Sequence, residues 1–551
     1  MEKAFQNHQE KKRKTAIVVG AGVGGVATAA RLQLAGFDVT VVEKNDFTGG
    51  RCSLIHHEGY RFDQGPSLLL LPRLFHETFR DLATTIEKEG VELLKCDPNY
   101  NIYFGDGEVV ELSSDLARMK NEIEKWEGAD GFEGYLGFLK ESHCHYDISY
   151  THVLKRNFEG FKSMLRWEFI GKVIKLHVHQ SVYTRAAKYF KTERLRRAFT
   201  FGSMYLGMSP YDAPGTYSLL QYTELAEGVW YPRGGFHRIV EILVNIGERM
   251  GVQYRLSTPV SKVLLSPDNK RATGVVLGDG TALHADVVVL NADLVHSYNT
   301  LLPPSPAATE LKERPHSCSS ISLYWSLSEK APKLGTHNIF LADSFKDSFD
   351  SIFTAHDLPD DLSFYVNVPS RVDPSAAPES GDSLVVLVPC GHLTSEHKDW
   401  DAILSRVRED VLRTILARTG EDLRPKITNE IVNTPEVWQE KFNLHQGAIL
   451  GLSHNFFNVL IFRPTTKHAT IEGCYFVGAS THPGTGVPVC LAGAKITAEQ
   501  ILDNHGMTAP WVTNEQFHAH RALLRGNKEM WFTLTAVVVL VLLVLAMRAM
   551  V

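Results

Sequence analysis

A glycine-rich turn near the N-terminus constrains the fold more than any other feature of this chain. An apolar run, Thr15 to Val19, ends at GAGVGG, residues 20–25, and an Ala-rich stretch of helical character follows over 26–35. A second apolar run over 38–42 ends at Glu43. The distance in sequence from the last glycine, Gly25, to this acid is close to the roughly 20 residues expected. Strand, GxGxxG, helix, strand and acid in this order predict a parallel βαβ unit that binds a dinucleotide.

The residues of this turn have separate roles in such a unit. Gly20 permits the tight turn, Gly22 lets a pyrophosphate approach the backbone, and Gly25 lets the helix pack on the strand. The helix N-terminus offers free N–H groups to the phosphates. Glu43 can accept hydrogen bonds from both hydroxyls of an adenosine ribose, and an acid here argues against a 2′-phosphate and hence against NADP.

Two more segments suit a large cofactor. GGR at 49–51 and GYRFDQGPS at 59–67 allow a second close approach to the backbone, with Arg51 as a fixed positive charge. YFVGASTHPGTGVP at 475–488 is again a strand and a glycine-rich turn that lead into a helix, expected from about residue 491. Between them, GVWYPRGG precedes a helical pattern over 239–250, and short strands are expected over 254–256, 260–265, 274–277 and 285–290.

These motifs resemble the FAD-dependent amine-oxidase and phytoene-desaturase superfamily, in which GxGxxG is followed by an acid, GGR and GxxxDxG. FNLHQGAILGLSH at 442–454, GVWYPRGG and VGASTHPGTGVP are similar to the carotenoid desaturases of bacteria and fungi. The resemblance covers about residues 15–501. It departs at Val489-Cys490-Leu491, where bacterial members usually carry glycine.

The resemblance implies an α/β fold with FAD as cofactor. A Rossmann-like FAD-binding domain would be discontinuous, from residues 15–70, 226–300 and 431–505, and interleaved with an α+β substrate domain from 71–225 and 301–430. The expected cofactor-binding residues are Gly20, Ala21, Gly22, Gly24, Gly25, Glu43, Lys44, Gly50, Arg51, Gly65, Pro66, Ser67, Val260, Gly478, Gly486, Val487 and Pro488.

The implied reaction removes two hydrogens from saturated carbons of an isoprenoid chain, most simply phytoene, to give neurosporene- or lycopene-type products by hydride transfer to FAD and loss of a proton. A related polyene isomerase or saturase, or a desaturase of another isoprenoid, stays open. An amine oxidase fits THPGTGVP less well, and a non-catalytic nucleotide-binding membrane scaffold is a rival of another class. A hydrocarbon has no polar group for a side chain to bind, so no catalytic base is assigned. Arg166 aligns only loosely with a charged group near the flavin.

The two substrate-domain insertions differ in pattern. Residues 71–225 are expected to be mostly helical, whereas about 310–430 mix strands over 321–327 and 384–389 with a helix over 400–419. An aromatic and Met-rich stretch over 199–211 can line an apolar tunnel, although an ordinary core is favoured. His143-Cys144-His145 has no third or fourth ligand at a suitable spacing, so no metal site is predicted.

Composition indicates the cellular compartment of the protein and excludes some classes of binding partner. A net charge of −6 excludes the basic surface that nucleic-acid binding needs, and seven widely spaced cysteines without CxxC indicate a reducing compartment. Residues 530–547 carry no charge and would form a helix of about 27 Å at about 1.5 Å per residue. Basic residues over 521–528 precede it, so a linker over 506–529 and a C-terminal transmembrane helix over 530–547 are predicted, with a cytosolic body on the endoplasmic reticulum. The expected partners are membrane lipid and an isoprenoid, and the oligomeric state stays open.

Overall fold

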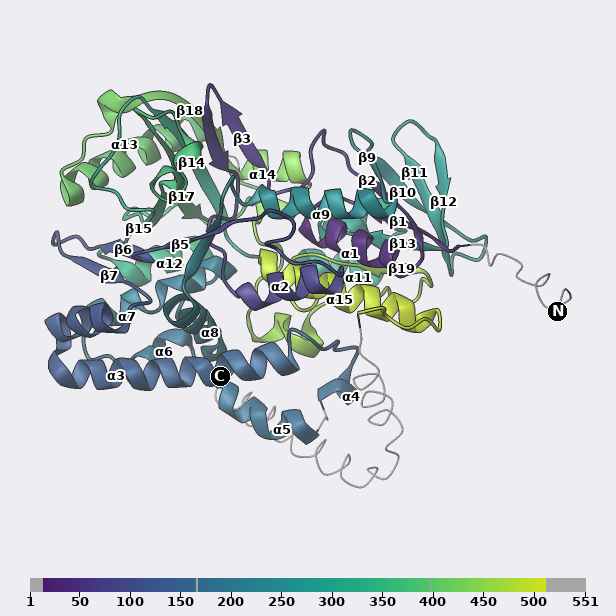
Figure 1. Ribbon diagram of the computed structural model, residues 1–551, viewed down its shortest axis with the longest axis horizontal. Coiled ribbons are helices and arrows are strands. Elements are labelled where there is room, and N and C mark those ends of the chain that lie inside the picture. Colours follow the sequence, from purple (N-terminus) through teal and green to yellow (C-terminus); the bar gives the residue numbers. More distant parts are fainter. Residues whose placement is uncertain (1–12, 165–166, 397, 512–551) are drawn as a thin grey trace, which may run out of the picture.

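The computed structural model describes residues 13–164, 167–396 and 398–511 (Figure 1). The predicted membrane helix over 530–547, most of the linker before it, and Arg166 lie outside the described residues. Among the described helices, none combines the length and the apolar character needed to cross a bilayer.

A five-stranded parallel sheet is assembled from segments far apart in the chain. Its order is β19-β13-β1-β2-β9, with every neighbouring pair parallel. The strands are β1 (Thr15–Val19), β2 (Asp38–Val42), β9 (Gln253–Arg255), β13 (Val287–Leu290) and β19 (Cys474–Phe476). The first two have the bounds predicted from sequence, and β13 is buried along its whole length, as a central parallel strand requires.

Helices from the beginning, middle and end of the described chain cover this sheet. They are α1 (Val23–Leu34), α2 (Pro72–Asp81), α9 (His237–Met250) and α15 (Val487–Asn504). The Ala-rich α1 packs against α9 and α15, because its small side chains allow close approach on several sides. The prediction placed the start of the last helix near residue 491, which is wrong by about one turn: α15 begins at Val487, and Pro488 is tolerated in its first turn.

A larger sheet lies beside the parallel one, at the upper left of Figure 1. Its order is β18-β14-β17-β16-β15-β6-β7, antiparallel except for the β15–β6 pair. The strands are β6 (Tyr100–Tyr103), β7 (Val109–Leu112), β14 (Ser319–Leu327), β15 (His337–Phe340), β16 (Phe364–Asn367), β17 (Asp382–Cys390) and β18 (Ile427–Asn433). Helix α13 (Trp400–Thr419) has the predicted bounds and packs on this sheet.

Residues 71–225 are mostly helical, as predicted, but they also contain the strands β6 and β7, which the sequence did not indicate. Each is four residues long, too short for its periodicity to be read, and pairing with the distant β15 stabilises the hairpin. The smaller pairings are β3 (Leu54–His57) with β4 (Tyr60–Asp63), β5 (Leu93–Cys96) with β8 (Val229–Pro232), and β10 (Val260–Leu265), β11 (Ala272–Leu277) and β12 (Ala282–His284) in a three-stranded sheet.

The rest of that insertion forms a helical layer along the lower edge of Figure 1. Its longest element is α3 (Leu116–His152), which is interrupted at Gly128, where the backbone adopts a positive φ of 69°. Shorter helices complete the fold: α4 (Phe161–Met164), α5 (Trp167–Val173), α6 (Val182–Ala186), α7 (Glu193–Ala198), α8 (Leu219–Tyr222), α10 (Leu294–His296), α11 (Pro306–Glu313), α12 (Phe345–Phe353) and α14 (Pro435–Phe442).

Candidate functional site

One cavity of about 700 Å³ extends from the carboxyl ends of β1 and β2 to the face of the antiparallel sheet. All predicted cofactor-binding residues except Ala21 and Gly25 line it. Residues from the first 70 positions, from β10 and from the C-terminal turn therefore meet around a single space, although more than 400 residues separate them in sequence. The lining changes along the cavity, from glycines and polar groups at one end to rings and aliphatic side chains at the other.

The glycine turn at the end of β1 leaves no room for side chains. A Cβ atom on Gly25 would lie 2.1 Å from the carbonyl oxygen of Gly20, and one on Gly24 would lie 2.8 Å from Asn291 Oδ1. Gly20 itself has a φ of +102°. The bare backbone thus forms a cradle at the N-terminus of α1 that fits the pyrophosphate of a dinucleotide.

Glu43 and Ala21 are joined at this end of the cavity. The Ala21 N–H donates to Glu43 Oε2 at 2.8 Å, and the Asn45 N–H donates to Oε1 at 2.9 Å. Ala21 does not line the cavity, so its role is to hold the carboxylate at the end of β2. A carboxylate has further lone pairs after these two bonds, which suit the hydroxyls of a ribose.

Asn291 was not among the predicted site residues, although it follows the strand β13 directly. Its Nδ2 donates to Gly20 O at 3.1 Å, and its side chain packs against the positions where Gly22, Gly24 and Gly25 would carry a Cβ. A polar residue at the carboxyl end of a central parallel strand was the available signal. Asn291 therefore fixes the shape of the glycine turn.

The C-terminal turn is held in place by the conspicuous FNLHQGAILGLSH segment. The Leu452 N–H donates to Ser480 Oγ at 3.1 Å, and the Thr485 N–H donates to His454 Nε2 at 3.1 Å. A Cβ on Gly451 would lie 2.2 Å from Ser480 Oγ, which explains the glycine there. The N-terminus of α15 consequently faces the cavity through Gly486, Val487 and Pro488.

Two of the predicted cations differ in their surroundings. Lys44 Nζ donates to Glu440 O at 2.8 Å and to Asn443 Oδ1 at 2.9 Å, so it ties β2 to α14. Arg51 donates from Nη1 to Ile449 O, and burial lowers its pKa while the nearby Asp293 raises it. Because an arginine stays charged in proteins, Arg51 places a positive charge in the cavity wall, which Asp293 also lines.

The other end of the cavity is apolar. It is lined by Phe201, Met204, Tyr205, Leu206, Leu220, Ile339, Leu341, Phe349, Phe364, Tyr365 and Leu387, among others. The stretch over 199–211 thus divides between two roles: part of it lines the cavity, whereas Phe199 and Met208 are buried in the core. The Tyr365 hydroxyl is bonded to Ser67 Oγ and His337 Nδ1, both at 2.7 Å, so this polar group is satisfied within the wall.

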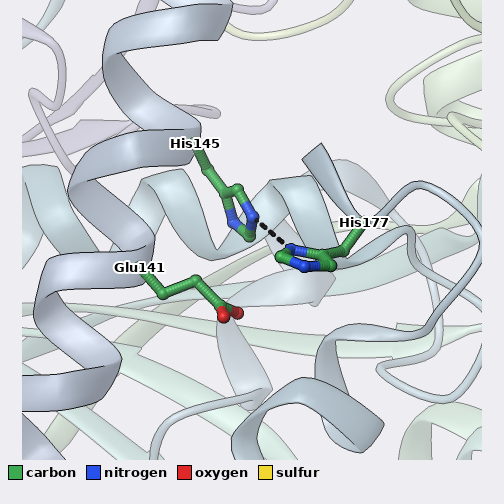
Figure 2. A group of neighbouring side chains, drawn as sticks. All are labelled: Glu141, His145 and His177. Atoms are coloured by element: carbon green, nitrogen blue, oxygen red, sulfur yellow. Dashed lines mark hydrogen bonds between the residues drawn. The ribbon is translucent and has the colours of Figure 1, made fainter. Parts of the chain in front are cut away.

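A separate group of ligand-type side chains lies in the helical layer (Figure 2). The relevant atoms of Glu141, His145 and His177 lie within 4.8 Å of one another, and His145 Nε2 is 3.0 Å from His177 Nδ1. Sequence spacing missed His177 as a neighbour of His145. However, the Arg185 guanidinium binds both carboxylate oxygens of Glu141, and a fixed cation at that carboxylate opposes the binding of a second one.

Comparisons with known proteins agree with this geometry. The sequence profile of the family described as flavin containing amine oxidoreductase matches residues 23–502. The chain is 61% identical over 521 residues to a phytoene desaturase of Fusarium fujikuroi, with 91% of each chain covered. It is 58% identical over 530 residues to a phytoene desaturase of Neurospora crassa, with 93% of this chain and 89% of that protein covered.

Solved structures show the same fold at low sequence identity. An oxidoreductase from Methanosarcina mazei superposes with a TM-score of 0.59 at 16% identity, covering 88% of this chain and all of the other. The glycine cradle, the acid at the end of β2 and the C-terminal turn fit a flavin dinucleotide. The chain belongs to the flavin-containing amine oxidoreductase family and is an FAD-dependent oxidoreductase of its phytoene-desaturase group.

Proposed function

We propose that this protein removes hydrogen from saturated carbons of a carotenoid precursor, phytoene in the first instance, to give neurosporene- or lycopene-type products. The observation that carries the proposal is the continuous cavity of about 700 Å³, which joins the dinucleotide cradle to an apolar chamber. The fungal relatives are named phytoene desaturases, which supports the same substrate class.

Residues at one end of the cavity would bind the cofactor, and residues at the other end would bind the substrate. Bound FAD supplies the two-electron acceptor. Glu43 and the backbone of residues 20–25 would hold its adenosine and pyrophosphate parts, and the α15 N-terminus would face another polar part. Phe201, Leu341 and Leu387, with their neighbours, would orient a hydrocarbon chain and exclude water from it.

We further propose that the enzyme takes its substrate directly from a membrane, with its body on the cytosolic side of the endoplasmic reticulum. At about 0.8 kcal/mol per CH₂, moving a forty-carbon hydrocarbon from lipid into water costs on the order of 30 kcal/mol. Such a substrate cannot cross water at a useful rate. The uncharged residues 530–547 in the sequence supply a membrane anchor for this purpose.

Product analysis tests the proposed reaction. The purified yellow holoprotein is incubated with phytoene in liposomes, and the extracted products are separated and their visible spectra recorded. A desaturase gives new conjugated double bonds and therefore new visible absorption. An isomerase gives isomers of phytoene without added conjugation, so that outcome would replace the proposal by the isomerase alternative. A protein that is isolated without flavin under every condition would instead favour the non-catalytic scaffold.

A truncation tests the role of the C-terminus. Deleting residues 531–551 should leave FAD bound, because within the described part of the chain no residue after Cys490 lines the cavity. Turnover of phytoene held in liposomes should fall at least tenfold, whereas turnover in detergent micelles should change little. Equal activity of the two forms on liposomes would contradict the proposed anchor.

A further inference from the structure

Arg463 is a fully buried arginine that pairs with no carboxylate of the described residues. Its exposed fraction is 1%. Among the described residues, no carboxylate lies within ion-pair distance of its guanidinium, and the groups that act on it electrostatically are Tyr217, Cys490 and Arg314. Burial lowers the pKa of Arg463 to about 10, so the side chain is still a cation at neutral pH. An uncompensated buried charge is costly, which calls for a functional reason.

Backbone carbonyls alone satisfy the guanidinium. Nε donates to Thr481 O at 3.0 Å, Nη1 donates to Ser453 O at 3.2 Å and to Asn458 O at 2.9 Å, and Nη2 donates to Ala479 O. Carbonyl dipoles hold the cation in place without neutralising its charge. The field of Arg463 therefore persists in its surroundings.

Those surroundings are a wall of the cofactor cavity. Ala479 and Thr481 line the cavity, and Cys490, another lining residue, is close enough for Arg463 to favour its thiolate form. Arg51, another cation of this wall, is only partly buried, and the negative charge of Asp293 acts on it. Arg463 thus adds a positive charge directly behind the part of the wall that Ala479 and Thr481 form.

We propose that Arg463 raises the reduction potential of the bound flavin by placing this permanent positive charge beside the cavity. Reduction adds negative charge to the flavin, and a fixed cation in a surrounding of low dielectric constant stabilises that charge. A higher potential suits an enzyme that must accept hydride from a C–H bond of a hydrocarbon. The inference depends on FAD binding and not on the identity of the substrate, so it survives or fails separately from the desaturase proposal.

The test is a dye-equilibration titration of the flavin potential in purified holoprotein, without substrate. In Arg463→Gln, which removes the charge, the equilibrium constant for two-electron reduction should fall at least tenfold, equal to about 30 mV. In Arg463→Lys, which keeps the charge with fewer hydrogen bonds, it should stay within threefold of wild type. If Arg463 only holds the turn in place, the two variants can lose FAD to different extents, but the flavin that they retain should have the potential of wild type.

A second pair of variants keeps the proposal testable if Arg463→Gln does not retain FAD. Asn458 is buried, and its carbonyl already accepts from Arg463. Asn458→Asp places a carboxylate near the guanidinium while leaving the guanidinium bonds to carbonyls possible, and it should lower the reduction equilibrium constant at least tenfold. Both variants lose the hydrogen bonds that Asn458 Nδ2 donates to Pro315 O and Ser453 Oγ. Asn458→Ala adds no charge, so its reduction equilibrium constant should match that of wild type. Equal potentials for Asn458→Asp and Asn458→Ala, or for Arg463→Gln and wild type, would overturn the proposal.

Discussion

The two ends of the cavity are built by different means. The dinucleotide end is made largely of backbone, at turns where glycine is required by a positive φ or by a close approach, as at Gly20 and Gly25. The apolar end is made of side chains from separate elements, including Phe201, Ile339 and Leu387. A backbone site tolerates almost no substitution at its glycines, whereas a side-chain wall tolerates apolar exchange and rejects charge. Variants at the two ends should therefore fail in different ways.

The largest effect is expected from Gly25→Val. The new Cβ would lie 2.1 Å from Gly20 O, a backbone atom that cannot move without opening the turn. We expect the protein to be isolated without FAD, measured as the ratio of flavin absorbance to protein. Gly171→Ala is the matched control, because nothing lies within 4 Å of its added Cβ. A yellow Gly25→Val protein with full flavin content would contradict the backbone cradle.

At the apolar end, Leu387→Lys should separate binding of cofactor from turnover. A lysine in this wall would either bury an unpaired charge or draw water into the chamber. FAD content should stay near that of wild type, while the rate of carotenoid formation should fall about a hundredfold. Leu387→Met, of similar volume, should retain most activity. Loss of FAD in Leu387→Lys would mean that the two ends are not separable.

The pH dependence of stability probes the polar layer beneath the apolar end. Phe201 packs on Tyr100 with ring centroids 5.4 Å apart, and the Tyr100 hydroxyl donates to Glu224 Oε1 at 3.0 Å. Burial raises the pKa of Glu224 from 4.5 to about 8. The folded state thus retains a proton that the unfolded chain releases, and this contribution to stability is lost as pH rises from about 4.5 to 8.

Glu224→Gln keeps the neutral shape and an acceptor for Tyr100 but does not titrate. The free energy of unfolding of Glu224→Gln minus that of wild type should therefore increase as pH rises, by no more than about 1.4 kcal/mol per pH unit. This difference should level off above pH 8. Denaturant unfolding of both proteins between pH 5 and 9 measures the difference. Parallel stability curves across this range would show that Glu224 is ionised in the folded protein.

The smallest effect is expected at Cys490, which lies in the Val489-Cys490-Leu491 segment where the resemblance to bacterial carotenoid desaturases weakens. The side chain lines the cavity, and burial raises the pKa of its thiol to about 11, so it is an unreactive thiol near neutral pH. Cys490→Ala should change the affinity for FAD by less than about threefold, measured by flavin fluorescence during titration of the apoprotein. A loss of FAD binding would show that this sulfur contributes to the cradle.

The difference between the two ends of the cavity also explains which parts of the protein can be predicted from its sequence. Strands β1 and β2 were predicted to the residue, because the motif around Gly22 and Glu43 is local and its spacing is set by the βαβ unit. The apolar wall was not: in the stretch over 199–211, periodicity cannot distinguish a side chain that faces a cavity from one buried in the core, such as Phe199.

Long-range partners were equally hidden. His177 stands 32 residues from His145 and meets it only in the fold, and β6 pairs with β15 across more than 200 residues. Arg463 carried no signal, because a buried arginine bound by carbonyls looks like any other arginine in sequence. Asn291 was visible as the residue after a strand, but its contact with the glycine turn required the structure.

The most direct test of the whole account is an anaerobic single-turnover reaction of the holoprotein with phytoene in liposomes. We expect the visible flavin absorbance to decrease as phytoene is added, while the absorption of a longer conjugated polyene rises in proportion. A cavity that holds both the flavin and the hydrocarbon requires these two changes to occur together. A flavin that stays oxidised in the presence of phytoene, with no new polyene formed, would contradict it.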